Sequence, residues 1–258
     1  MARRFGVEGG IIGVTAAAVV SVVVAGALAF SNAGGGSKAE ADDVASGQKA
    51  KGAGAPVSSS IVHSSDRPGR SLNITIDDGP DPTWTPRVLD VLKKHNVKAV
   101  FCMIGPQAAA HPDLVKKVVA AGHKLCDHTI SHDTTMNKKP ESYQSKEILD
   151  AEKMIEKAAG GAQVEYYRAP GGAFTPYSRK LAADRGMRPL GWNVDSKDFE
   201  GGSVETIEST VRHELTLPHH TTVLFHDGGG NRSRTVDSLD RLLPWMQSQG
   251  YGFGFPQR

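Results

Sequence analysis

Cysteine, net charge and internal repetition are scarce in this sequence. Its 258 residues include two cysteines, and basic and acidic residues nearly balance, which leaves a formal net charge of +2. Because no long basic run is present, nothing in the chain indicates nucleic-acid binding. No segment recurs at a fixed period, which excludes a solenoid or propeller built from repeats.

One stretch near the start lacks charge altogether. Arg3 and Arg4 precede residues 11–30, an apolar run without a charged side chain. Basic residues before an apolar run are typical of an export signal, and small residues at 27–29 and 31–33 offer cleavage sites. The run is also long enough to span a bilayer. We therefore expect residues 1–33 to be a cleaved signal peptide or an uncleaved membrane anchor, with the folded part secreted or tethered outside the membrane.

Large apolar residues are nearly absent from residues 34–60, which are rich in Gly, Ala, Ser and Lys. Such a segment buries too little surface to offset its chain entropy, so a flexible linker is predicted. The folded domain should then comprise residues 61–258, an ordinary size for one domain. In an exported protein Cys102 and Cys126 would form one disulfide, with two buried thiols on core strands as the alternative.

The folded part alternates between strand and helix patterns. Short apolar runs predict strands at 72–77, 97–104, 123–126, 165–168, 187–194, 221–225 and 251–255. Helical spacing of apolar residues predicts helices at 84–95, 112–121, 141–159, 175–186, 204–215 and 236–249. This alternation predicts an α/β domain with a parallel sheet curled into a barrel.

The chain is organised around residues 72–80, which read LNITIDDGP. Apolar and polar residues alternate until Asp77 and Asp78, and Gly79 and Pro80 then end the strand. Two neighbouring acids at a strand end can take different roles, one as a metal ligand and the other as a base. An acidic surface turn is the alternative.

Chemically active residue types follow several of the other predicted strands. They are His128, Arg168, Asp195, Asp198 and His226. Because the strands of a parallel α/β sheet end at one edge, these side chains should lie with Asp77 and Asp78 in a single site.

His128 and His132 are four residues apart, a spacing that would place both imidazoles on one face of a helical turn. Imidazole suits zinc and related metals, and a carboxylate can complete the ligand set. Two histidines and one aspartate leave a coordination position open, as in catalytic sites. A histidine pair alone is only moderately specific, but together with Asp77 and Asp78 it predicts a metal site.

These motifs resemble those of the polysaccharide deacetylases, carbohydrate esterase family 4, over residues 73–253. Five blocks occur in order: TIDDG at 75–79, HTISH at 128–132, RAPGG at 168–172, DSKDF at 195–199 and LFH at 224–226. The resemblance implies a distorted (β/α) barrel with parallel strands. It also implies that the protein removes acetyl groups from amino sugars, or from xylan as some members do.

The resemblance also implies a role for each site residue. Asp78, His128 and His132 would hold one divalent ion, with zinc expected first and cobalt or another divalent ion as alternatives. Asp77 would act as the base and His226 as the acid. Arg168 would pair with Asp77, orienting it and lowering its pKa so that it stays ionised, and Asp198 would hydrogen-bond His226 and favour its charged form. The N–H of Gly171 would stabilise the oxyanion. Phe199 and Leu224 would line the acetyl pocket, although a core-filling role fits them nearly as well, and Arg168 could be a purely structural ion pair.

Three positions depart from the family pattern. Ile76 replaces an aromatic residue, Gly171 stands where many relatives carry tyrosine, and Phe199 replaces tryptophan. These changes affect specificity rather than catalysis, because no inferred ligand or proton-transfer residue is missing.

From the sequence we therefore expect an extracytoplasmic, metal-dependent, monomeric N-deacetylase of glycans that contain N-acetylglucosamine, such as peptidoglycan or chitooligosaccharides. It would contact the membrane only through an uncleaved N-terminal segment. An acetyl xylan O-esterase and a non-catalytic glycan-binding protein of the same fold are the alternatives.

Overall fold

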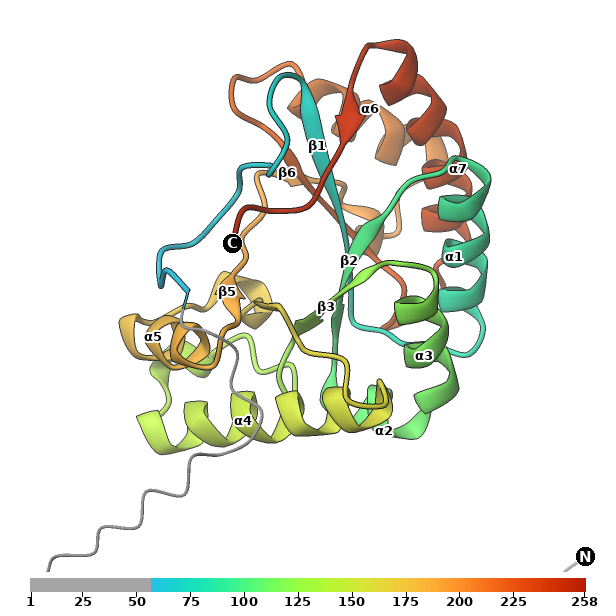
Figure 1. Cartoon of the computed structure of the whole chain (residues 1–258). Coiled ribbons are helices and arrows are strands. Elements are labelled where there is room, and N and C mark those ends of the chain that lie inside the picture. The colour runs from blue at the N-terminus through green and yellow to red at the C-terminus, as the bar shows by residue number, and fades with distance from the viewer. Residues whose placement is uncertain (1–56) are drawn as a thin grey trace, which may run out of the picture. The chain divides into compact units, whose positions relative to one another are not determined.

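The computed structural model describes residues 57–258 (Figure 1). The predicted signal or anchor at 1–33 and most of the predicted linker lie outside the described residues. The first described residue already contacts the domain, because the N–H of Val57 donates to the carbonyl of Ala183 at 3.2 Å. No helix within 57–258 is both long and apolar enough to cross a membrane.

The described chain alternates between strands and helices, as predicted. The strands are β1 (Ser71–Asp77), β2 (Ala99–Met103), β3 (Lys124–Asp127), β4 (Tyr166–Tyr167), β5 (Arg188–Pro189), β6 (Val194–Asp195), β7 (Thr222–His226) and β8 (Gly252–Phe253). The α-helices are α1 (Trp84–Lys94), α2 (Gly105–Ala110), α3 (Pro112–Ala120), α4 (Glu141–Ala158), α5 (Pro176–Asp184), α6 (Val204–Glu214) and α7 (Ser233–Ser248). Three single turns of 3-10 helix are η1 (Met136–Lys138), η2 (Pro170–Gly172) and η3 (Asp198–Glu200).

All strands of the sheet run parallel, in the order β5-β4-β3-β2-β1-β7-β6, with β8 added beside the start of β1. The helices surround this sheet in a sequence of packed neighbours, α6-α7-α1-α3-α4-α5 (Figure 1). Parallel strands with helices packed outside them give a curled half-barrel, which confirms the α/β class and the parallel sheet.

The barrel is not closed by hydrogen bonds. Within residues 57–258 no backbone pairing joins β5 to β6, and the predicted strand at 187–194 is wrong, because two short strands stand there at opposite edges of the sheet. The carbonyls of Leu190 and Gly191, which lie between them, accept hydrogen bonds from the guanidinium of Arg168 at 3.2 and 3.0 Å. A side chain thus occupies backbone acceptors that a continuous strand would have used.

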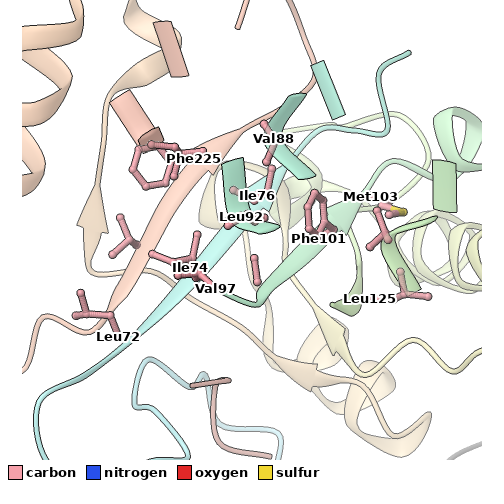
Figure 2. Close-up of a cluster of buried hydrophobic side chains, with 14 of the residues drawn as sticks. Leu72, Ile74, Ile76, Val88, Leu92, Val97, Phe101, Met103, Leu125 and Phe225 are labelled. Carbon is pink, nitrogen blue, oxygen red and sulfur yellow. The ribbon is translucent and has the colours of Figure 1, made fainter. Parts of the chain in front are cut away.

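Strand β1 is buried on both faces. Its apolar side chains, Leu72, Ile74 and Ile76, join the main core beneath α1, where Val88 and Leu92 meet them (Figure 2). Its polar face is buried as well, since Asn73 and Thr75 are fully inaccessible to solvent. Each is hydrogen-bonded, the Asn73 amide to Thr222 Oγ1 at 2.9 Å and the Thr75 hydroxyl to the carbonyl of Val223 at 2.8 Å. The alternation in the sequence therefore separates an apolar outer core from a polar interior.

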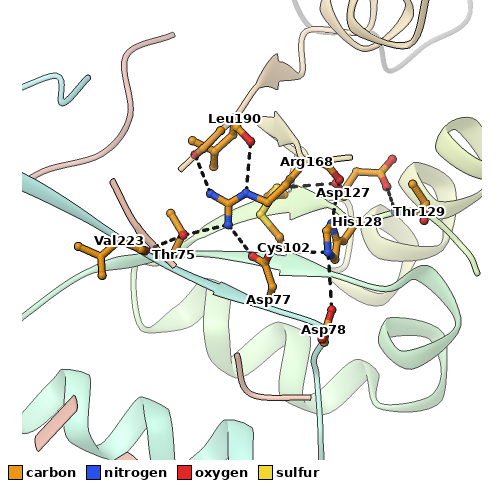
Figure 3. Close-up of a disulfide and its surroundings, with 12 residues drawn as sticks. Thr75, Asp77, Asp78, Cys102, Asp127, His128, Thr129, Arg168, Leu190 and Val223 are labelled. Carbon is orange, nitrogen blue, oxygen red and sulfur yellow. Dashed lines mark hydrogen bonds and ion pairs between the residues drawn. A yellow bond between two sulfur atoms is a disulfide. The ribbon is translucent and has the colours of Figure 1, made fainter. Parts of the chain in front are cut away.

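The two cysteines form a disulfide between neighbouring strands. Cys102 on β2 and Cys126 on β3 stand opposite each other in register, with Cα atoms 4.1 Å apart (Figure 3). Both are fully buried in a small inner cluster with Tyr166 and Leu190. Of the two alternatives left open by the sequence, the structure has the disulfide.

Candidate active site

The end of β1 turns two adjacent carboxylates toward different partners. Asp77 is the last strand residue, whereas Asp78 has φ = 76°, a left-handed conformation that departs from the strand alternation. The N–H of Asp78 donates to the carbonyl of Cys102 at 3.1 Å, and a Cβ on Gly228 would lie only 2.2 Å from the carbonyl oxygen of Asp78. Glycine at 228 thus lets the loop after β7 approach closely enough to bring its residues to the same site.

Arg168 fixes the first of these carboxylates. Arg168 is fully buried, and its Nη1 donates to Asp77 Oδ1 at 2.7 Å and to Thr75 Oγ1 at 2.9 Å (Figure 3). Burial raises the pKa of Asp77, and the charge and hydrogen bond of Arg168 oppose this shift without cancelling it. The predicted pairing is confirmed, but the predicted lowering of the Asp77 pKa is wrong in net direction because desolvation outweighs the ion pair.

The second carboxylate faces the two histidines. Asp78 Oδ1 lies 3.6 Å from His128 Nε2 and 3.3 Å from His132 Nε2, and the three ligand atoms lie within 4.8 Å of one another. His128 Nδ1 lies 2.8 Å from the carbonyl of Arg168, which places the ring proton on Nδ1 and leaves Nε2 as an electron-pair donor (Figure 3). Burial lowers the pKa of His128 to about 3, so this ring is neutral.

The convergence of these atoms fits a divalent metal ion. Asp78 Oδ1 is buried and has no hydrogen-bond partner within the described residues, which is costly unless a ligand satisfies it. Zinc and related ions bind two imidazoles and one carboxylate, and this set of three ligands leaves one coordination position of the ion open. Asp78, His128 and His132 would hold the ion.

The prediction that the two histidines share a helical turn is wrong. Residues 128–132 form an irregular loop in which Thr129 and His132 have left-handed φ values of 68° and 52°. Two acidic residues that the sequence analysis missed hold this loop: Asp127 Oδ1 accepts from the N–H of Thr129 at 2.7 Å, and Glu147 Oε2 accepts from the N–H groups of Ile130 and Ser131 at 3.1 and 2.9 Å. Glu147 comes from the middle of α4, so no local pattern could have identified it.

His226 and Asp198 meet as predicted. Strand register aligns His226 on β7 with Asp77 on β1, and Asp198 Oδ1 lies 2.7 Å from His226 Nδ1. Asp198 Oδ2 accepts two further hydrogen bonds, from the His226 N–H at 2.9 Å and from Thr235 Oγ1 at 2.8 Å. Burial by itself lowers the pKa of His226, but the hydrogen bond and charge of Asp198 raise it above its ordinary value. The predicted hydrogen bond between Asp198 and His226 is confirmed.

The three predicted substrate-contacting residues lie around the same space. Gly171 has φ = 58°, and no acceptor for its N–H is found within residues 57–258, so this donor is free for an oxyanion. Leu224 is buried on β7, whereas Phe199 is 48% exposed, with its ring centroid 5.2 Å from that of His226. A core-filling role for Phe199 is therefore excluded.

Every residue of the predicted site except Arg168 and Asp198 lines one cavity of about 420 Å³, and these two lie behind Asp77 and His226. Asp195 and Thr134 also line it, as do Trp192 and Arg232, and the sequence analysis assigned none of these four to a contact with the ligand. Asp227, which no sequence pattern indicated here, is fully buried, and burial raises its pKa to about 7, with Asp78 and Asp77 adding to the shift. The arrangement brings together a carboxylate paired with an arginine, an imidazole paired with a carboxylate, a backbone N–H donor and three ligand atoms that fit a metal ion.

The chain is similar to known proteins over most of its length. Residues 64–190 match the model of a family described as polysaccharide deacetylase. Over 185 residues the chain is 38% identical to a peptidoglycan-N-acetylglucosamine deacetylase of Bacillus cereus, which covers 70% of this chain and 84% of that protein. It is 34% identical over 193 residues to a chitooligosaccharide deacetylase of Bradyrhizobium sp., covering 70% and 87% of the two chains.

A solved structure shows the same fold. The crystal structure of the Bc1960 peptidoglycan N-acetylglucosamine deacetylase in complex with 4-naphthalen-1-yl-N-oxidanyl-benzamide superposes with a TM-score of 0.69 at 31% identity, and covers 76% of this chain and 89% of that chain.

Proposed function

This chain belongs to the polysaccharide deacetylase family, and from that premise we propose that it hydrolyses the N-acetyl groups of N-acetylglucosamine residues in extracytoplasmic glycans. The observation that carries the proposal is the meeting of Asp77, His226 and the Asp78–His128–His132 set at one cavity. The relatives named above act on peptidoglycan or on chitooligosaccharides, and both polymers contain N-acetylglucosamine.

The chain's own groups divide the work of amide hydrolysis. Asp77 Oδ1 accepts a hydrogen bond from Arg168. Asp77 Oδ2 accepts no hydrogen bond within the described residues and is free to take the proton of an attacking water. The free N–H of Gly171 would donate to the oxyanion as it forms. A divalent ion, when bound, supplies Lewis-acid polarisation of the acetyl carbonyl and of water.

His226 completes the reaction as the acid. Its Nδ1 is bound to Asp198, so its other ring nitrogen is left to deliver a proton to the leaving amine. A pKa raised by Asp198 keeps a larger share of the ring protonated near neutral pH. Base and acid thus reach the same amide from two neighbouring strands, β1 and β7.

The extracytoplasmic address is supported by two observations. Arg3 and Arg4 precede an uncharged apolar run, and the disulfide between Cys102 and Cys126 is a bond of oxidising compartments. A reporter fused after Arg258 should be active only outside the cytoplasm. A reporter that is active only in the cytoplasm would contradict the export proposal, and N-terminal sequencing of the mature protein would decide between cleavage and anchoring.

Acetate release tests the activity itself. The purified full chain is given peptidoglycan, chitooligosaccharides and acetylated xylan, each with and without a chelator, beside the His132→Ala variant. We expect chelator-sensitive release from at least one of the two N-acetylated glycans, and no release by the variant. Release from xylan alone would indicate an O-esterase instead, and binding without release would indicate a glycan-binding protein.

A further inference from the structure

A second cavity opens beside the active site. It measures about 340 Å³, and it shares Phe199, Gly229 and Arg232 with the active-site cavity. The remaining lining includes Asn231 and Arg234 near the start of α7. Because the two cavities adjoin along shared side chains, a polymer whose reacting sugar lies in the first can place a neighbouring group in the second.

Arg232 stands at the boundary with part of its guanidinium unused. The residue is only 6% exposed, and its Nε donates to the carbonyl of Gly228 at 2.6 Å. Its two terminal nitrogens have no hydrogen-bond or ion-pair partner within residues 57–258. Neither terminal nitrogen is fully buried, and Arg232 lines both cavities, so these donors face the cavity space. The unpaired end of Arg232 therefore points to an acceptor supplied from outside the chain.

The surrounding charges favour an anionic acceptor. The carboxylate of Asp198 is already occupied by His226 and Thr235. Asp78 Oδ2 and Arg232 Nη2 both lie beside Gly229, where each would contact a Cβ placed on that residue. The two side chains nevertheless form no ion pair within the described residues. Arg234 adds a second positive charge, with Nη1 held on the carbonyl of Gly201 at 2.6 Å. The N-terminus of α7, a helix of 16 residues, also favours negative charge at this point.

We propose that this second cavity is a subsite for a carboxylate carried by the glycan next to the reacting N-acetylglucosamine, and that Arg232 binds it; this inference rests on the proposed function. A guanidinium with two free terminal nitrogens matches the two oxygens of a carboxylate. A chitooligosaccharide offers only hydroxyl and acetamido groups there. A peptidoglycan-type glycan offers carboxylates, either on the lactyl ether of the alternate sugar or on an attached peptide, so the subsite selects acidic over neutral glycans.

Substrates of matched length test the subsite. They are a neutral N-acetylglucosamine tetramer, an alternating tetrasaccharide with free lactyl carboxylates, and the same tetrasaccharide with peptides attached. For each, kcat/KM for acetate release is measured for wild type, Arg232→Gln, Arg232→Lys and the control Arg241→Gln. Arg241 is exposed on α7 and pairs with Glu205 and Glu208. Arg241→Gln therefore removes one positive charge from the same helix at a position away from the cavity.

We expect Arg232→Gln to lower the ratio of acidic to neutral kcat/KM about tenfold or more, the order of magnitude for loss of a desolvated charge pair. Arg232→Lys should lower the ratio less than Arg232→Gln does, because lysine keeps the positive charge but lacks the paired N–H donors of a guanidinium. The control Arg241→Gln should keep the wild-type ratio. The acidic substrate that shows the larger preference identifies the source of the carboxylate as the sugar or the peptide.

Two results would overturn the subsite. The first is a ratio of acidic to neutral kcat/KM for Arg232→Gln that stays within twofold of wild type. Metal content and thermal unfolding are measured beside it to establish that the variant is intact. The other needs no variant: amidation of the carboxylates should remove the wild-type preference, and an undiminished preference would refute the role of charge. Acetate release with an unchanged ratio rejects only the subsite, whereas no release from any glycan rejects the proposed function with it.

Discussion

Replacing Glu147 with alanine should weaken metal binding although Glu147 touches no metal ligand. One carboxylate oxygen, Oε2, accepts from the N–H of Ile130 at 3.1 Å and from both the N–H and the hydroxyl of Ser131 at 2.9 Å. These bonds hold the loop that ends at His132, whose φ of 52° is a conformation that few side chains adopt unaided. Without Glu147, the loop loses the contacts that keep this imidazole pointed at Asp78.

The magnitude follows from the bonds removed. An N–H left without its acceptor costs about 1–3 kcal/mol, and Glu147→Ala removes the acceptor of two. Partners that orient metal ligands typically contribute about 10–100-fold in affinity, which corresponds to roughly 1.4–2.8 kcal/mol at 1.4 kcal/mol per factor of ten. We therefore expect a loss in that range for Glu147→Ala. Glu147→Gln keeps a neutral acceptor and should lose less than tenfold.

Competition with a chromophoric chelator measures the affinity directly, without reference to turnover. Glu141→Ala is the matched control, because Glu141 is an exposed residue on the first turn of the same helix. Metal affinity of Glu147→Ala within twofold of wild type, together with a lowered melting temperature, would refute the reasoning. It would mean that Glu147 stabilises the fold without positioning His132.

Other substitutions test the assignment of roles. Asp198→Asn removes the charge that raises the pKa of His226, so the falling limb of the rate–pH profile should move to lower pH; an unmoved limb would assign the acid to another group. Asp77→Asn should lose about 10²–10⁴-fold in turnover yet retain metal, whereas Asp78→Asn should purify without it. Metal analysis beside acetate release checks this, and the opposite pattern would exchange the two roles. Cys102→Ser removes a disulfide between residues separated by 24 positions, which should lower the free energy of unfolding by about 3.5 kcal/mol. Chemical denaturation measures it, and equal stability of the wild type with and without reductant would contradict the estimate.

Local pattern was sufficient for most elements of the fold. The helix predicted at 84–95 is observed as α1, Trp84–Lys94, because apolar spacing and terminal basic residues act within a few turns of chain. The short helix α2, Gly105–Ala110, was missed, since GPQAAA has no apolar stripe. Its contact with α4 is what places it: a Cβ on Gly105 would lie 2.8 Å from the Cα of Ala151. Such a contact between distant segments leaves no local pattern.

The sequence by itself determined which residue types could do the chemistry and that they would gather at one edge of the sheet. Asp77, Asp78 and His226 follow strands, and parallel strands end on the same side, so topology alone brings them together. The same reasoning could not give the direction of the Asp77 pKa, because that depends on how deeply the Arg168 pair is buried.

Only the tertiary structure decided how those residues are held. The loop from His128 to His132 is held by Glu147 on α4, and the carbonyls of Leu190 and Gly191 are held by the guanidinium of Arg168. The unpaired end of Arg232 became visible only once its possible partners within residues 57–258 had positions. Periodicity and strand ends are local properties that a sequence expresses directly. A hydrogen bond between groups far apart along the chain exists only after folding has fixed the distance between them.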